Sequence, residues 1–172
     1  MTATNFTNST RAIFAAAVAV VASGQVALAD KVEDAKALVD SFYSNLIAEN
    51  YPPMINMFMP NATAQYTTKY GYGLPDDVFN FTREEVQAYA DIEIPEEYLE
   101  YFKDYKELDR SYKILGAEET GDTVTVTGQA VQNYEMKAYK GQNIQTDTFV
   151  INFPEGVETP LIADYKGVLT FK

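Results

Sequence analysis

The chain has 172 residues, with 13 lysines and arginines against 25 aspartates and glutamates, and a net charge of −12 at pH 7. It contains no histidine, no cysteine and no tryptophan. A surface this acidic repels phosphate groups, so neither a nucleic acid nor an anionic membrane surface is expected as a partner. The missing residue types exclude a Ser-His-Asp triad, a thiolate nucleophile and an ordinary zinc or copper site. Catalysis would have to use carboxylates, tyrosine or lysine.

The first 29 residues have the pattern of a secretory signal peptide. Arg11 is the only charged residue before an apolar run at 12–22, and Val26-Ala27-Leu28-Ala29 forms an A-x-A-like cleavage site. The run is shorter than the roughly 20 apolar residues that a membrane helix needs. We therefore predict cleavage after Ala29 and a periplasmic or secreted mature protein, residues 30–172, which forms a single domain with no membrane partner. Retention of the signal as an anchor is the alternative.

Helical periodicity dominates the start of the predicted mature chain. Apolar residues recur at intervals of three and four from Asp30 to Asn50, which predicts a long amphipathic helix. Pro52-Pro53 suits the first turn of a second helix, which we expect to end near Pro60. The alternation from Ala62 to Tyr70 predicts a strand. The glycines and Pro75 that follow predict an excursion of the chain and not a strand.

The second half of the chain is predicted to be mostly sheet. Thr82-Arg83-Glu84-Glu85 is a capping box, which predicts a helix that ends near Ala90. A tyrosine-rich helical pattern then runs from Pro95 to Leu108, as a core element or as a lid over a cavity. Glycine-containing turns separate four strands, expected near 112–117, 123–136, 144–153 and 161–171, with the turns at 120–122, 140–142 and 154–156.

This order of elements predicts an α+β domain in which an antiparallel sheet curls around the first helix. The segment Phe42 to Tyr66 has the pattern F-Y-x-x-L-x-x-x-x-Y…M-x-x-M-F-x-P-N-A-T-x-x-Y. It resembles the nuclear transport factor 2-like superfamily, which includes SnoaL-like polyketide cyclases and ketosteroid isomerase. The resemblance covers residues 31–171. It implies a cone-shaped, curved antiparallel (mixed) sheet wrapped around a long N-terminal helix, two to three further short helices, and a homodimer formed through the sheet.

The resemblance does not settle the function, because the superfamily contains isomerases, dehydratases, epoxide hydrolases and binding modules. An ungapped match places the isomerases' carboxylate base at Tyr66 and their tyrosine at Phe42, and neither residue can do that chemistry. Tyr43 is about 100° further around the helix and is expected to face elsewhere. The dehydratases depend on a histidine, and Asp109-Arg110 does not reproduce the Asp-Arg-Asp group of the epoxide hydrolases.

The strand near 144–153 carries the best candidate for a functional carboxylate. Asp147 shares a face with Gln145 and Phe149, which favours a pocket carboxylate with a raised pKa, and a wet structural aspartate is the alternative. Asp164 is assigned to the outer face because of the neighbouring Lys166. No metal site and no cofactor are predicted, since the acidic doublets do not match a calcium-binding loop. The predicted ligand-binding residues are Phe42, Tyr66, Gln132, Tyr134, Asp147 and Phe149.

Two functions are compatible with these residues. The first is an exported binding or scaffold protein whose aromatic cone takes a small apolar or amphipathic ligand, without a cofactor. The alternative is a cofactor-independent isomerase or lyase in which Asp147 acts with Tyr66 or Tyr134. The outer face of one strand could also dock a second copy or another exported protein, or be solvated; its residues are Thr123, Thr125, Thr127, Gln129, Val131 and Asn133.

Overall fold

The computed structural model describes residues 31–90, 103–157 and 159–172. These residues form an α+β structure, as the sequence predicts. A first helix spans residues 31–47. The elements after it are α2 (Tyr51–Asn56), β1 (Phe58–Lys69), β2 (Asp77–Thr82), α3 (Arg83–Ala90), β3 (Tyr105–Thr120), β4 (Thr123–Met136), β5 (Tyr139–Asn152) and β6 (Leu161–Phe171).

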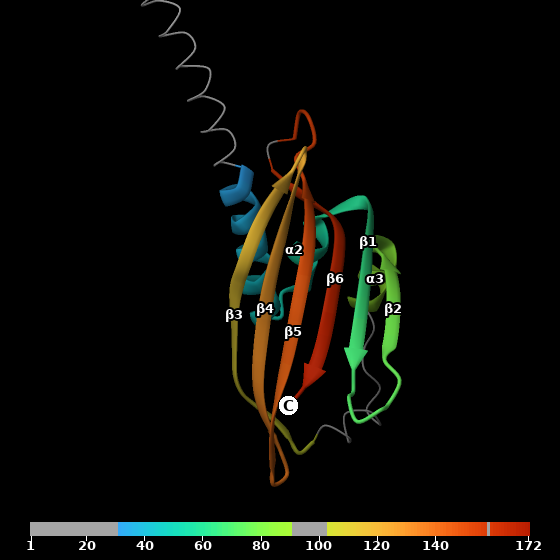
Figure 1. Ribbon diagram of the computed structural model, residues 1–172, viewed down its shortest axis with the longest axis vertical. Helices are drawn as coiled ribbons and strands as arrows, with labels where there is room; N and C mark the ends of the chain where they lie inside the picture. The colour runs from blue at the N-terminus through green and yellow to red at the C-terminus, as the bar shows by residue number, and fades with distance from the viewer. Residues whose placement is uncertain (1–30, 91–102, 158) are drawn as a thin grey trace, which may run out of the picture.

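The strands form one six-stranded mixed sheet in the order β2-β1-β6-β5-β4-β3. β1 runs parallel to β6, and the other neighbouring strands are antiparallel. The first helix, α2 and α3 all lie on one face of the sheet, behind the strands in the view of Figure 1. The helix-covered face of the sheet therefore encloses the core, and none of the described helices covers the opposite face.

The core joins the first helix to the middle strands of the sheet. Phe42 of this helix meets Phe149 of β5 edge to face, with 5.0 Å between ring centroids. Val124 and Val126 of β4 are completely buried in the same cluster. Each such side chain contributes roughly 1.5–3 kcal/mol through its removal from water. None of the helices that the structure describes is long and apolar enough to cross a membrane.

The predicted capping box is confirmed at the start of α3. The Thr82 amide donates to Glu85 Oε2 at 2.7 Å, and the Glu85 amide donates back to Thr82 Oγ1 at 3.3 Å. The Thr82 amide and the Thr82 hydroxyl both donate to the Glu85 carboxylate, and these two bonds lower the pKa of that carboxyl group. Arg83 fastens α3 to α2, because its guanidinium donates to the Ile55 carbonyl and to Asn56 Oδ1, both at 3.2 Å. The capping box therefore stabilises the start of α3, and Arg83 holds this helix against α2.

Several predicted boundaries were wrong. The predicted helix from Pro95 to Leu108 is strand over Tyr105–Leu108, since β3 already pairs with β4 at Tyr105 and Met136. Residues 103–104 form a turn, and the rest of the predicted helix, at 95–102, lies outside the described residues, as does the question of a lid. The second helix ends at Asn56 and not near Pro60, because β1 already begins at Phe58.

The turn predicted at 140–142 lies inside β5, because the chain reverses near Lys137, whose φ is 56°. The expected excursion contains a strand, β2, which pairs along β1 at the edge of the sheet. Nearly all residues of β2 are exposed. The strand was not predicted because it lacks the alternation of polar and buried apolar residues by which a half-buried strand is recognised.

Candidate functional site

One row across the sheet contains a completely buried carboxylate. Gly128 of β4, Asp147 of β5, Gly167 of β6 and Tyr66 of β1 are neighbours in that order. The exposed fraction of Asp147 is 0%, although aspartate is almost never fully buried without partners. A glycine therefore lies on each side of the carboxylate, where any other residue would place a Cβ atom.

Tyrosine rings occupy the space that the two glycines leave. A Cβ atom on Gly128 would lie 2.6 Å from Cε2 of Tyr43, a residue of the first helix. On Gly167 it would lie 2.5 Å from the hydroxyl of Tyr165 and 2.9 Å from Cδ2 of Tyr66. Real Cβ contacts are not this short. The two glycines are thus required for the close approach of the rings to the sheet.

The buried carboxylate is satisfied by three side chains. Tyr43 donates to Oδ2 of Asp147 at 2.7 Å, and Tyr165 donates to Oδ1 at 2.7 Å. The side-chain amide of Gln145 donates to Oδ1 at 2.9 Å and to Oδ2 at 3.2 Å. Burial raises the pKa of the Asp147 carboxyl group, and the three donors offset part of that rise.

The tyrosines around Asp147 are poor acids. Burial and the neighbouring charge of Asp147 raise the pKa values of Tyr43 and Tyr165 well above the ordinary value. The same two causes raise the pKa of Tyr66 to about 12. All three hydroxyl groups therefore keep their protons at neutral pH and act as hydrogen-bond donors.

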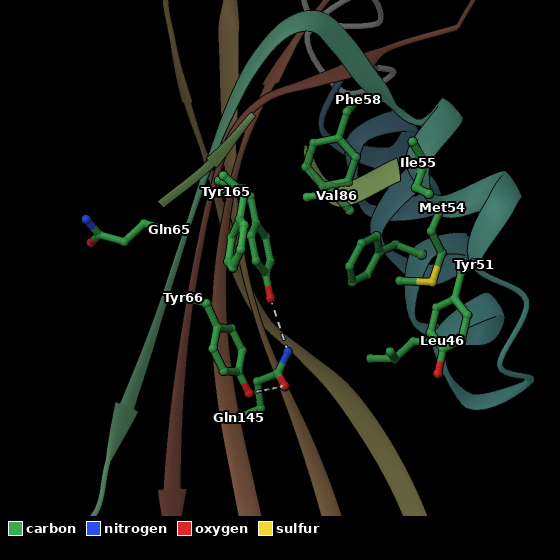
Figure 2. A pocket seen from close by; sticks show the side chains of 13 residues that line it. Leu46, Tyr51, Met54, Ile55, Phe58, Gln65, Tyr66, Val86, Gln145 and Tyr165 are labelled. Carbon is green, nitrogen blue, oxygen red and sulfur yellow. Dashed lines mark hydrogen bonds between the residues drawn. The ribbon is translucent and has the colours of Figure 1, made fainter. Parts of the chain in front are cut away.

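A cavity of about 530 Å³ lies between the sheet and the helices. Apolar side chains make up its helix side, as Figure 2 shows for Leu46, Met54 and Ile55. On the sheet side its wall includes Tyr66, Gln145 and Tyr165. The Tyr66 hydroxyl donates to Gln145 Oε1 at 3.2 Å, and Gln145 Nε2 donates to the Tyr165 hydroxyl at 3.1 Å. The cavity is therefore mostly apolar and has one polar end.

A smaller cavity of about 190 Å³ adjoins the polar end, because Leu46, Tyr66 and Gln145 line both cavities. Arg110 and Gln132 also line it. The Arg110 guanidinium donates to the Leu46 carbonyl at 3.3 Å and to the Glu107 carboxylate at 2.6 Å. Gln132 donates to the same carboxylate. The charge of Arg110 is therefore paired within the protein.

The structure brings only some of the predicted ligand-binding residues together. Phe42 and Tyr66 line the larger cavity, whereas Gln132 lines the smaller one. Phe149 is completely buried in the core, and Asp147 is buried behind two cavity-lining partners. Tyr134 lies near the turn between β4 and β5, where its ring covers Gly141 and stacks on Tyr105. Their roles as ligand contacts stay predictions.

Sequence reasoning missed two residues of this network. Tyr43 was expected to face away, yet its side chain is completely buried and bonds Asp147. Tyr165 was overlooked because β6 contains a bulge: Ile151 pairs with Ile162 and Val150 pairs with Asp164. The extra residue between them shifts the alternation, so that residues 162 and 165 both face the core.

Asp164 itself is on the outer face, as predicted. Thr63 donates to its carboxylate at 2.5 Å, and the ammonium of Lys166 lies 3.9 Å from it. Within the described ranges, no group of three or more acidic side chains is arranged to hold a metal ion.

The fold of the chain is that of nuclear transport factor 2-like proteins. Similar solved structures include a ketosteroid isomerase-like protein from Erwinia carotovora atroseptica, with 16% identity and a TM-score of 0.51 over 81% of this chain and 95% of that chain. An NTF2-like protein with a cystatin-like fold from Novosphingobium aromaticivorans has 11% identity and a TM-score of 0.55 over 86% of both chains.

The CaMKII hub of S. rosetta is also similar in structure, with 10% identity and a TM-score of 0.55 over 81% of this chain and 96% of that chain. No protein-family model and no curated protein sequence matches the chain. At identities this low, the likeness establishes the fold and leaves the function to the site.

Proposed function

We propose that this chain is an exported, non-catalytic binding protein that takes a small apolar or amphipathic molecule into the larger cavity. The observation that carries the proposal is the cavity itself, with its volume of about 530 Å³ and its mostly apolar wall. Ligand sites in proteins typically measure about 300–1,000 Å³ and combine apolar walls with a few polar groups. Tyr66, Gln145 and Tyr165 supply those groups here.

The placement of Asp147 favours binding over the alternative, an isomerase or lyase. A catalytic base must come within hydrogen-bond reach of the proton that it removes. Asp147 is completely buried, and it does not line the larger cavity. Gln145 and Tyr165, which do line the cavity, bond both carboxylate oxygens. A substrate proton in the cavity would meet these side chains first.

Export and dimer formation complete the proposal. The signal pattern of residues 1–29 supports cleavage after Ala29 and a periplasmic or secreted location. The outer face of β4 supports a homodimer through the sheet, because it offers a strip of threonine, glutamine and asparagine side chains on the face that no described helix covers.

Native mass spectrometry of the exported protein, purified without denaturation, tests these points together. We expect the mass of residues 30–172, a dimer of that mass, and an additional organic species that leaves on activation. A chain that retains residues 1–29 would contradict the cleavage, and a monomer would contradict the dimer. An empty dimer would favour a scaffold role.

Filling the cavity tests the binding site directly. Ala64 lines the larger cavity from β1, so Ala64→Phe should place a ring inside it. We expect this variant to weaken binding of the neutral fluorescent probe N-phenyl-1-naphthylamine about tenfold or more, a loss of roughly 1.4 kcal/mol. Fluorescence titration of the mature protein measures the affinity.

Thr67→Phe is the matched control for this variant. Position 67 lies on the same strand but on the opposite face, together with Gln65, whose side chain points away from the cavity in Figure 2. We expect probe binding to be unchanged in this control. Equal affinities in the wild type and Ala64→Phe would place the probe elsewhere and contradict the proposed site.

A further inference from the structure

The buried carboxylate fixes the orientation of the Gln145 amide group. The oxygens of Asp147 accept hydrogen bonds, so the amide must turn its NH2 group toward them. Gln145 Nε2 lies 2.9 Å and 3.2 Å from the two carboxylate oxygens and 3.1 Å from the Tyr165 hydroxyl. An NH2 group has two hydrogens, and these partners use both of them.

The orientation of Gln145 in turn determines what Tyr66 can offer. With the NH2 group facing Asp147, the amide oxygen faces Tyr66, and the Tyr66 hydroxyl donates to it at 3.2 Å. A phenol has one proton, so Tyr66 keeps only lone pairs for a further partner. The proton of Tyr165 is used in the same way, in its 2.7 Å bond to Asp147.

The other polar groups near the larger cavity do not change this balance. Gln65 also lines the larger cavity, but its side chain points away from it in Figure 2 and bonds Asn80 at 3.0 Å. Tyr51 belongs to the helix side and is 44% exposed, so water can satisfy its hydroxyl group. No lysine or arginine is among the described residues that line the larger cavity. Arg110 of the smaller cavity is already paired with Glu107.

We infer that the polar end of the larger cavity accepts hydrogen bonds and has no donor to spare, so that it selects a hydroxyl group over a carbonyl or carboxylate on the same apolar skeleton. A ligand hydroxyl can donate to the free lone pairs of Tyr66 or Gln145. A ligand carbonyl finds no proton there, and burial of a polar group without a partner is unfavourable. A carboxylate additionally finds no cation. This inference specifies the ligand class and rests on the proposed function.

The test compares two pairs of probes with the mature protein by isothermal titration calorimetry. The pairs are 2-adamantanol with 2-adamantanone and cyclododecanol with cyclododecanone, which share a skeleton and differ only at the oxygen. We expect each alcohol to bind about tenfold more tightly than its ketone, as one net hydrogen bond allows. Equal affinities, or a preference for the ketones, would overturn the inference and leave the proposed function in place. If none of the four probes binds, the proposed function fails as well.

Two variants attribute the preference to named atoms. Tyr66→Phe removes one acceptor but frees the lone pair of Gln145 Oε1 that the Tyr66 hydroxyl occupies, so the alcohols should keep their advantage over the ketones. Gln145→Leu leaves the Tyr66 proton without its acceptor, and this proton can then bond a ketone, so the preference should fall to one or reverse. Tyr70→Phe, which removes a hydroxyl that bonds Asp77 at 2.7 Å outside both cavities, should keep the preference of the wild type. An unchanged preference in Gln145→Leu, or a preference for the ketones in Tyr66→Phe, would overturn the inference.

Discussion

Replacement of Asp147 by alanine is expected to lower the free energy of unfolding by about 3–5 kcal/mol, the range typical when one partner of a buried polar network is removed. The alanine would leave the hydroxyl groups of Tyr43 and Tyr165 and the amide of Gln145 without their acceptor. Each of these donors lies in the interior or at the cavity wall, so a water molecule that took the place of the lost acceptor would itself have to be buried at a cost in free energy. Urea denaturation of the mature protein measures the change.

The Asp147→Asn variant separates the shape of this side chain from its charge. Asparagine keeps one acceptor oxygen and nearly the same volume, so Asp147→Asn should lower the free energy of unfolding much less than Asp147→Ala does. Burial raises the pKa of the native Asp147 carboxyl group above that of the unfolded chain, which is about 3.9. Between the two pKa values the native state binds more protons than the unfolded state. The contribution of Asp147 to stability is therefore complete below about pH 3.9 and declines as the pH rises through the native pKa.

The wild type should consequently lose stability relative to Asp147→Asn as the pH rises from about 4. The difference between the two proteins isolates this carboxyl group, because all other titrating groups are shared. The slope can reach about 1.4 kcal/mol per pH unit within the titration window. A difference that does not change between about pH 4 and pH 8 would show that the pKa of Asp147 is not raised. A difference that moves in the opposite direction would show that the three hydrogen bonds outweigh burial.

Much of the fold could be predicted because the patterns that specify it are local. In β4, small or apolar residues alternate with polar ones from Thr123 to Ala130, and the predicted bounds of 123–136 agree with the structure. The first helix shows the 3.6-residue period of a half-buried helix. The segment Tyr105–Leu108 was misassigned because tyrosines and leucine at intervals of three and four fit a helix, although the residues pair with β4. Pairing between strands is a long-range property that such periodicity does not report.

The site was harder to predict because it depends on how elements meet. Asp147 and its neighbours Gln145 and Phe149 could be assigned to one face from the two-residue period of a strand. Tyr43 could not, since the curvature of the sheet decides how much of the first helix is covered. Both Phe42 and Tyr43 are buried, although they point in directions about 100° apart. Gly128 and Gly167, which pair with Asp147 on the neighbouring strands, are the signal that could have indicated an aromatic ring packed against the sheet at this point.

Gly128→Ala is expected to be the second severe substitution, with a loss of about 3 kcal/mol of unfolding free energy. A Cβ atom at this position would lie 2.6 Å and 2.9 Å from Cε2 and Cζ of the Tyr43 ring. The ring cannot move aside at little cost, because it stacks on Tyr112 at 5.0 Å and its hydroxyl bonds Asp147. The substitution therefore adds steric strain and breaks a buried hydrogen bond.

Gly116→Ala is the matched control, because it makes the same change in the neighbouring strand β3. A Cβ atom at position 116 has no other atom within 4 Å, and its φ is not positive. Alanine there should be neutral or slightly stabilising, since glycine has the greater conformational entropy in the unfolded chain. A similar loss in both variants would mean that glycine is needed for the backbone of the strands and not for the approach of the Tyr43 ring.

A double-mutant cycle with Tyr43→Leu completes the argument. Leucine removes the part of the ring that meets position 128, so Gly128→Ala should cost much less in the Tyr43→Leu background than in the wild type. We expect a coupling of about 1–2 kcal/mol, within the range for residues in direct contact. Additive losses would show that Gly128 and Tyr43 act independently. In that case the glycine would not be the residue that admits the Tyr43 hydroxyl to the buried carboxylate.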